Sequence, residues 1–320
     1  MALYLTEQHI AQLLRIDDVI AAVEGAFLQQ GMRKAVNRPR QRVIAGKSVL
    51  HVMPGGLPGL GVMGFKAYAG GGRTGTRFLA HLYDTETGEL LAVMEADRLG
   101  QLRTGAASAV ATKYMARREA GSIGIIGAGR QARSQVIAVS RVRPIALVKC
   151  YSRSAGQREA FAEEMTSELG AEVVAVDVPQ EAVLDSDIVI TATSAREPVL
   201  LGAWLGGGMH INAIGSNAST RRELDEGAVR RSAVIAADDL EQAKIESGDL
   251  IAAVQSGALD WDAVLELGRI VTGETPGRRA PDDITLFESQ GIAIEDVATM
   301  KLAYDLARER GAGEPFRPPG

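Results

Sequence analysis

The segment Gly127-Ala128-Gly129-Arg130-Gln131-Ala132 has the GxGxxA spacing that binds the pyrophosphate of a dinucleotide. It follows the apolar run Ser122–Ile126, which is typical of a buried parallel strand, and it precedes apolar residues at helical spacing between Ala132 and Val142. The first glycine allows a tight turn, and the second lets the backbone approach the anion. The segment therefore predicts a Rossmann nucleotide site that includes Gly127, Ala128, Gly129, Arg130 and Gln131. A glycine turn that serves only packing is the structural alternative.

Polar residues follow the other predicted strands, at the sheet edge where open α/β sheets bind their ligands. After the second strand come Ser152, Arg153 and Ser154, whose hydroxyls and guanidinium suit the 2′-phosphate of NADP. An acidic residue there would instead bind the ribose of NAD. The segment therefore predicts NADP(H) in preference to NAD(H), with a solvated Arg153 beside an NAD site as the alternative. Later strand ends add four residues to the predicted cofactor site: Thr193, Ser194, Gly215 and Asn217.

Three cations, Arg42, Lys66 and Arg103, occupy strand or strand-end positions before the fingerprint. Lys66 lies among apolar residues, where a solvated lysine would be unusual. Arg103 precedes an alanine-rich helix, whose N-terminal dipole does not favour a cation. A substrate carboxylate bound by all three would explain these positions, with arginine giving paired hydrogen bonds and lysine a point charge. The alternative is ordinary ion pairing with nearby acids, namely Glu95, Asp97 or Asp84.

The elements that must position these residues change in character along the chain. Residues 6–30 have a helical pattern, and five short strand candidates separated by glycine and proline turns follow between residues 42 and 94. A mostly antiparallel sheet suits this part. From residue 121 the pattern alternates between strand and helix, with six strands expected at 123–126, 147–151, 172–176, 188–192, 211–214 and 234–237.

These patterns predict an α/β protein with two domains. Residues 118–291 would form a Rossmann domain, a doubly wound parallel sheet that binds the dinucleotide. Residues 1–117 would form a smaller α+β substrate domain. The C-terminal segment 292–320 would join that first domain, with a helix over 292–310 that packs back on it and a frayed Gly/Pro-rich tail over 311–320.

Composition excludes several classes of function. The chain of 320 residues is 46% hydrophobic and 23% charged with a net charge of −5, so it lacks the basic field of a nucleic-acid binder. No apolar run reaches the roughly 18 residues that cross a bilayer, and the N-terminus lacks the pattern of a signal peptide. One cysteine, Cys150, excludes an internal disulfide, and the four histidines lack ligand spacing. We expect a cytoplasmic protein without a metal, a membrane or a nucleic-acid partner.

At these motifs the chain resembles the ornithine cyclodeaminase/mu-crystallin family, which includes an archaeal-type alanine dehydrogenase and ketimine reductases. The resemblance covers nearly the whole chain. It rests on Lys66, on Arg103-Thr104, on the glycine fingerprint and on the later segments 211–215, 222–225, 246–249, 284–287 and 296–298.

The resemblance implies a homodimer formed through the first domain, which would then serve substrate binding and dimerisation, with an active site in the cleft between domains. It also implies that Arg42, Lys66 and Arg103 hold the α-carboxylate of an amino or imino acid and that Thr104 contacts the cofactor. The family chemistry is hydride transfer between the nicotinamide and a carbon that is an amine on one side of the reaction and an imine on the other.

Asn217 departs from the family pattern. In the cyclodeaminases and the archaeal-type alanine dehydrogenase that the chain resembles, the matching residue is an aspartate, which can act as a base at the substrate nitrogen. An amide cannot exchange a proton at neutral pH, although it can orient an imine or amine through hydrogen bonds. Proton transfer would then fall to Lys66, to water or to solution.

The resulting prediction is an NAD(P)H-dependent reductase that converts an imino acid to an amino acid and is reversible as an amino-acid dehydrogenase. Lys66 and Asn217 would be its catalytic residues. A cyclodeaminase-type lyase that releases ammonia is one alternative, which Asn217 disfavours. A non-enzymatic, NADP-gated binder of small ligands, similar to mu-crystallin, is another, which the three cations disfavour.

Overall fold

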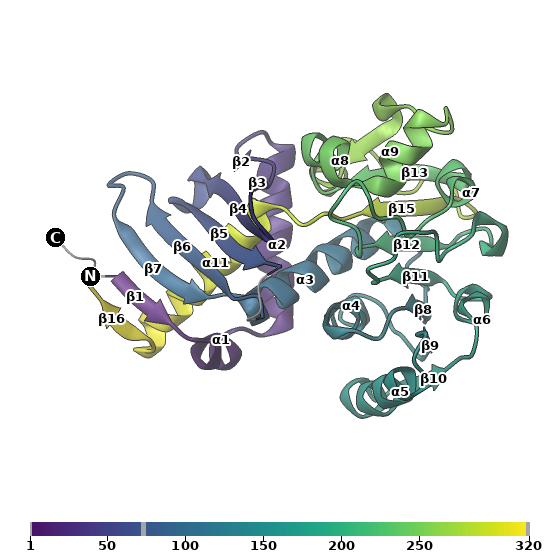
Figure 1. Cartoon of the computed structure of the whole chain (residues 1–320), viewed down its shortest axis with the longest axis horizontal. Coiled ribbons are helices and arrows are strands. Elements are labelled where there is room, and N and C mark those ends of the chain that lie inside the picture. The colour runs from purple at the N-terminus through teal and green to yellow at the C-terminus, as the bar shows by residue number, and fades with distance from the viewer. Residues whose placement is uncertain (1, 72–74, 318–320) are drawn as a thin grey trace. The chain divides into compact units, whose positions relative to one another are not determined.

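The computed structural model describes residues 2–71 and 75–317, which fall into two compact units (Figure 1). Unit 1 comprises Met1–Arg103 and Ile292–Gly320, and unit 2 comprises Thr104–Gly291. Helix α3 (Asp97–Met115) is divided between the units near its start. The boundary predicted after residue 117 lies beyond the other end of this helix.

Unit 1 is built on an eight-stranded sheet of order β16-β1-β7-β6-β5-β4-β2, with β3 also paired to β4. Neighbouring strands are antiparallel except β1 and β7. All five predicted strands form. The additional β1, β2 and β16 have only four, two and three residues, too few for a period of two to be recognised. The strands are β1 (Ala2–Leu5), β2 (Val36–Asn37), β3 (Gln41–Ala45), β4 (Ser48–Leu57), β5 (Val62–Gly70), β6 (Phe78–Asp84), β7 (Leu90–Glu95) and β16 (Glu314–Phe316).

Three helices accompany this sheet: α1 (Glu7–Leu13), α2 (Ile16–Gly31) and α11 (Ala293–Arg310). The single helix expected over residues 6–30 is interrupted because Leu14 and Arg15 are extended. The predicted C-terminal helix forms as α11 and ends, as expected, before Gly311, which adopts the left-handed conformation with φ 63°. The tail expected to be frayed instead forms β16, because it pairs with β1, and residues 318–320 lie outside the described residues.

Two glycines let α11 approach the sheet closely. Gly55 of β4 lies opposite Gly64 of β5. A Cβ atom on Gly55 would lie 3.0 Å from the Cβ of Ala293 in α11, so a larger residue there would push this helix away from the sheet. A Cβ atom on Gly64 would lie 2.3 Å from the carbonyl oxygen of His81 in β6 and 3.2 Å from the side chain of Met300 in α11, so a larger residue there would first disturb the pairing of β5 with β6.

The two faces of this sheet differ in exposure, as the strand period of two requires. One face is buried and contains four residues in register from β4 to β7: Met53, Lys66, Ala80 and Met94. The other face exposes large apolar side chains, each about two-fifths accessible: Leu50 42%, Met63 42% and Leu79 41%.

Unit 2 contains an eight-stranded sheet of order β10-β9-β8-β11-β12-β15-β13-β14, and all its neighbouring strands are parallel. The α/β Rossmann prediction is confirmed, and all six expected strands form. Sequence analysis missed β14, which has three residues, and β15, a short apolar run between β12 and β13. The strands are β8 (Ser122–Ile126), β9 (Leu147–Tyr151), β10 (Glu172–Ala175), β11 (Ile188–Thr191), β12 (His210–Ala213), β13 (Ser232–Ala237), β14 (Val264–Glu266) and β15 (Ile284–Glu288).

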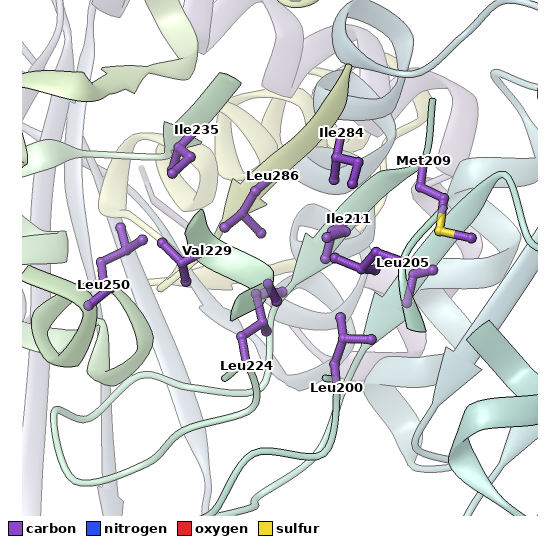
Figure 2. Packing of buried hydrophobic residues seen from close by; sticks show 14 of the residues in the cluster. Leu200, Leu205, Met209, Ile211, Leu224, Val229, Ile235, Leu250, Ile284 and Leu286 are labelled. Atoms are coloured by element: carbon purple, nitrogen blue, oxygen red, sulfur yellow. The ribbon is translucent and has the colours of Figure 1, made fainter. Parts of the chain in front are cut away.

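Helices connect these strands as crossovers: α4 (Arg130–Ser140), α5 (Ala155–Leu169), α6 (Pro179–Val183), α7 (Glu226–Arg231), α8 (Leu240–Glu246), α9 (Gly248–Gln255) and α10 (Leu267–Val271). Figure 2 shows part of the resulting core, in which Ile211, Ile235 and Leu286 of three neighbouring strands pack together. The burial of these apolar side chains away from water is the main source of stability of such a sheet.

Cys150 lies buried in β9, and burial raises the pKa of its thiol to about 12. It is therefore protonated and unsuited to act as a nucleophile. Within residues 2–71 and 75–317, no three or more His, Cys, Asp or Glu side chains are grouped so that they could hold a metal ion. In the same ranges no helix has the length and apolarity needed to cross a membrane.

Candidate active site

The glycine fingerprint joins β8 to α4 in unit 2. Gly127 has φ 124°, and a Cβ atom there would lie 2.4 Å from the carbonyl oxygen of Ala192, so only glycine fits the turn. Gly129 is the N-cap of α4, and a Cβ atom on it would meet nothing within 4 Å. No side chain caps α4. The N-terminus of this helix therefore presents backbone N–H groups to an open space, which suits a pyrophosphate.

A cavity of about 620 Å³ adjoins this turn. Six predicted cofactor residues line it: Gly127, Ala128, Ser152, Arg153, Thr193 and Ser194. The loop after β11 supplies further wall residues that sequence analysis missed, namely 195–199. Strand ends indicate where a loop starts, but they do not indicate how far along it the ligand extends.

The other predicted cofactor residues do not line this cavity. Arg130 and Gln131 begin α4, and Ser154 is the N-cap of α5. Gly215 and Asn217 follow β12, and Thr104 lies in α3 with its carbonyl oxygen accepting a hydrogen bond of 3.0 Å from Gln135 Nε2. Their roles at the cofactor stay predictions.

The residues that line the cavity fit a nicotinamide dinucleotide. Gly127 and Ala128 line the cavity where the chain enters α4, and Gly129, the N-cap of that helix, has open space where a Cβ atom would lie. Ser152 and Arg153 lie on the wall beyond β9, where an adenosine ribose would be read. Arg158 of α5 fixes this wall by donating to the carbonyl oxygen of Ser152 at 3.1 Å.

A second constellation, within unit 1, buries two of the three predicted substrate cations. Lys66 Nζ donates to Asp296 Oδ1 at 2.8 Å, and Arg103 Nη1 donates to Glu295 Oε2 at 2.7 Å. Arg103 Nε also lies 3.0 Å from Asp296 Oδ1. Lys66 and Arg103 are only 2% and 7% exposed, and both carboxylates are fully buried. Ion pairs do form here, but with the first turn of α11, which sequence analysis had not identified as the partner.

The third predicted cation, Arg42, lies on β3 and is half-exposed. Arg40, two residues earlier, is buried at 6% exposure and donates from Nη1 to the hydroxyl of Tyr68 at 3.0 Å. Arg40 also contributes to lowering the pKa of Lys66. Sequence analysis missed Arg40 because Arg40 and Arg42 are two residues apart and look equivalent in the sequence. Only the structure shows that β3 starts at Gln41, so that Arg40 precedes the strand and Arg42 lies in it. Arg40 is therefore buried near enough to Lys66 for its charge to act on it, while the role of Arg42 at the substrate stays a prediction.

Burial and charge shift the pKa values within this cluster. Burial, followed by the charge of Arg103, lowers the pKa of Lys66 to about 8, while Asp296 acts in the opposite direction. Burial raises the pKa of Glu295 to about 6, against the opposing influence of Arg103. The cluster thus brings the cationic side chains of Arg40, Lys66 and Arg103 together in a buried region, with the carboxylates of Glu295 and Asp296 paired to Arg103 and Lys66.

Asn217 lies in the loop after β12 and is half-buried. The hydroxyl of its neighbour Ser216 donates to the carbonyl oxygens of Ala218 at 3.3 Å and Arg221 at 3.0 Å, which shapes this loop. An amide side chain on this ordered loop can donate and accept hydrogen bonds, but it cannot act as a base.

Comparison with known proteins identifies the family of the chain. Residues 2–311 match the family model described as the ornithine cyclodeaminase/mu-crystallin family. The chain belongs to this family. It is 35% identical over 321 residues to the alanine dehydrogenase of Archaeoglobus fulgidus, with 98% of each chain covered.

Solved structures of the ornithine cyclodeaminase/mu-crystallin family agree with the fold. The Δ1-pyrroline-2-carboxylate reductase of Thermococcus litoralis, in complex with NADH and L-proline, has a TM-score of 0.94 at 39% identity, covering 98% of this chain and all of that one. An archaeal alanine dehydrogenase dimer with bound NAD has a TM-score of 0.93 at 34% identity, with 99% of each chain covered.

Asp296→Asn is expected to lower the free energy of unfolding by roughly 3–5 kcal/mol, because the buried charge of Lys66 then faces a neutral amide and Arg103 keeps only its pair with Glu295. Asp305→Asn, on the same helix, breaks the exposed pair with Lys301 and is expected to cost no more than about 1 kcal/mol. Chemical denaturation of the two variants measures the difference. Equal losses would show that the buried pair contributes no more than a surface pair.

Proposed function

We propose that this protein is an NAD(P)H-dependent imino-acid reductase, reversible as an amino-acid dehydrogenase. The observation that carries the proposal is the buried cluster of Arg40, Lys66 and Arg103, three cationic side chains whose hydrogen-bond donors suit an α-carboxylate. The dinucleotide cavity of unit 2 supports a redox reaction. The relatives named above act on alanine and on pyrroline-2-carboxylate, an amino acid and a cyclic imino acid.

Each residue of the cluster has a task in this proposal. Arg103 and Arg40 bind the carboxylate through their guanidinium forks, and the carboxylates of α11 hold Arg103 in place. The nicotinamide dinucleotide, when bound, supplies the hydride. Such positioning removes much of the entropic part of the barrier.

Lys66 is the proposed proton donor at the substrate nitrogen. Its pKa of about 8 allows Nζ to hold a proton at neutral pH and to release it more readily than an ordinary lysine. Asn217 would orient the imine nitrogen without exchanging a proton. Reduction of an imino acid that arrives already formed needs no further base, which favours a reductase over an ammonia-releasing lyase.

We propose further that the preferred cofactor is NADP(H). The support is Arg153 on the cavity wall next to Ser152, with no acidic side chain in the segment Tyr151–Ser154 that ends β9. The two solved relatives hold NADH and NAD, so the preference is proposed for this chain alone.

We also propose a homodimer formed through unit 1. The sheet face opposite α11 exposes Leu50, Met63 and Leu79, and Phe65 stacks on His81 across it with ring centroids 4.6 Å apart. An apolar sheet face of this kind requires a cover. The archaeal alanine dehydrogenase named above is a dimer. The mass of the protein in solution, from light scattering, tests this proposal.

The proposed activity is tested by mixing the protein with NADPH or NADH, 2-oxo acids and ammonia or methylamine, and with preformed cyclic imines. Absorbance at 340 nm is expected to fall. Lys66→Met is expected to abolish turnover, a loss of at least about 10³-fold, because substrate binding and proton donation are both removed. Lys47→Met, an exposed lysine, is the control. Oxidation of neither cofactor with any imine, or full activity of Lys66→Met, would refute the proposal.

The rate of reduction is expected to fall as the pH rises through about 8, because Lys66 loses the proton that it donates and the charge that binds the carboxylate. The pH dependence of kcat/KM measures this. The pKa of the imine itself also contributes, so Lys66→Arg is the control: a guanidinium stays charged in this range. If kcat/KM falls equally steeply with rising pH in Lys66→Arg, the group that loses its proton is on the substrate and not Lys66.

Arg153→Ala is expected to raise KM for NADPH by about tenfold or more and KM for NADH by less than about threefold, because only the 2′-phosphate is lost as a contact. Arg230→Ala, an exposed arginine of the same unit, should change neither constant. Equal increases for the two cofactors would place Arg153 away from the 2′-phosphate.

A further inference from the structure

We infer that Glu223 is a positioning residue that holds the wall of the dinucleotide cavity, residues 193–199, at both of its ends. The inference rests on the nucleotide site of the proposed function and not on the choice of substrate. Every residue from Thr193 to Val199 lines the cavity, whereas Glu223 does not and is only 1% exposed. Glu223 therefore acts through the loop.

The carboxylate of Glu223 fixes the beginning of this wall. Its Oε1 accepts hydrogen bonds from both the backbone nitrogen and the hydroxyl of Thr193, each at 2.6 Å. Its Oε2 accepts from the hydroxyl of Thr191 at 2.8 Å and from the backbone nitrogen of Gly215 at 2.8 Å. One buried carboxylate thus joins the carboxyl ends of β11 and β12, from which two of the loops predicted to contact the cofactor begin.

The backbone of Glu223 fixes the end of the same wall. Its carbonyl oxygen accepts from the backbone nitrogens of Val199 at 2.8 Å and Leu200 at 2.9 Å. Leu200 and Leu224 form an isolated parallel bridge, and both side chains enter the hydrophobic core shown in Figure 2. The loop 193–199 is consequently held at its start by the side chain of Glu223 and at its end by its carbonyl group.

Glu223 has little freedom to move. Asp249 Oδ1 accepts from the backbone nitrogens of Glu223 at 2.9 Å and Leu224 at 2.8 Å. A Cβ atom on Gly215 would lie 2.4 Å from Glu223 Oε1 and 2.2 Å from the carbonyl oxygen of Thr193, so the three segments are in direct contact. We call Glu223 with its contacts to Thr191, Thr193 and Gly215 the brace. The brace leaves no space for a side chain at Gly215.

The arrangement requires a carboxylate and not merely a polar group. Two of the four donors are backbone N–H groups, which cannot reverse their direction. A glutamine has one acceptor oxygen and an NH₂ group that only donates, so at least one of those N–H groups would face another donor. An unsatisfied buried N–H group weakens whatever it holds in place.

Two other buried acids face Glu223. The charges of Asp249 and Glu223 help to raise the pKa of Glu288, and burial is the first cause of the high pKa of both Glu288 and Asp249, the latter at about 7. Burial also raises the pKa of Glu223, but four hydrogen bonds from Thr191, Thr193 and Gly215 act in the opposite direction. Because Glu223 has the larger set of donors, we assign the negative charge to Glu223 in preference to its neighbours. Arg222 is the cation that opposes the shift at Asp249.

Glu223→Gln tests the inference, with Asp187→Asn as the matched control. Asp187 Oδ2 accepts from the backbone nitrogens of Gly121 at 2.9 Å and Ser122 at 3.1 Å and from the Ser122 hydroxyl at 2.9 Å, at the opposite edge of the same sheet. Both variants exchange a carboxylate for an amide that faces backbone N–H groups, and Asp187→Asn in addition loses the ion pair of Asp187 with Arg117 at 2.6 Å. The dissociation constant of NADH or NADPH is measured by fluorescence titration, below the melting temperature of each variant and without substrate.

Glu223→Gln is expected to weaken cofactor binding about tenfold or more, while kcat at saturating cofactor changes by less than about threefold. Asp187→Asn is expected to leave the dissociation constant within about twofold even where it lowers the melting temperature. Unchanged binding in Glu223→Gln, or equal weakening in both variants, would reduce Glu223 to a structural residue. If Glu223→Gln does not fold, Thr191→Val removes one donor without changing shape, and the same titration decides: a twofold to fivefold weakening supports the brace, and no change refutes it.

The measurement separates this inference from the proposed reaction. Cofactor binding needs neither an imino acid nor Lys66. Weakened binding in Glu223→Gln together with no imine reduction by the unaltered protein would support the brace and refute the reductase.

Discussion

The burial of Lys66 and Arg103 is the constraint on which unit 1 depends. A cation removed from water without a partner costs several kcal/mol, more than most single interactions can offset. The partners lie 230 and 192 residues further along the chain, in Asp296 and Glu295. The chain must therefore leave unit 1, complete unit 2 and return as α11. Gly55 lets the first turn of α11, which carries both carboxylates, lie close against the sheet.

Features contained in one continuous segment could be predicted from the sequence. The strand, glycine turn and helix around Gly127 depend only on neighbouring residues, and they form as expected. The parallel sheet of unit 2 follows from the alternation of strands and helices. Short strands such as β14 escaped prediction because three residues show no period.

Features that depend on distant residues could not be predicted in the same way. No local pattern connects Glu295 and Asp296 to Lys66. The choice between Arg40 and Arg42 depends on which of two alternate positions the fold buries. Glu223 lies in a segment with no regular structure, and its importance becomes visible only when the ends of β11 and β12 are placed beside it. Beyond the carboxyl ends of parallel strands, the backbone N–H groups of the loops have no neighbouring strand to bond with. The Glu223 side chain accepts two of these N–H groups, those of Thr193 and Gly215.

The discontinuity of unit 1 has a consequence for the order in which the protein takes shape on the ribosome. Unit 2 is a single stretch, Thr104–Gly291, and all of it is made before Ile292 and the residues that follow. Residues 2–103 of unit 1 lie earlier in the chain, but unit 1 lacks α11, β16 and both carboxylates until unit 2 has been synthesised. We expect unit 2 to fold before unit 1 is complete. Until α11 is made, this helix cannot cover the sheet of unit 1, and transiently exposed apolar surface of that kind promotes aggregation.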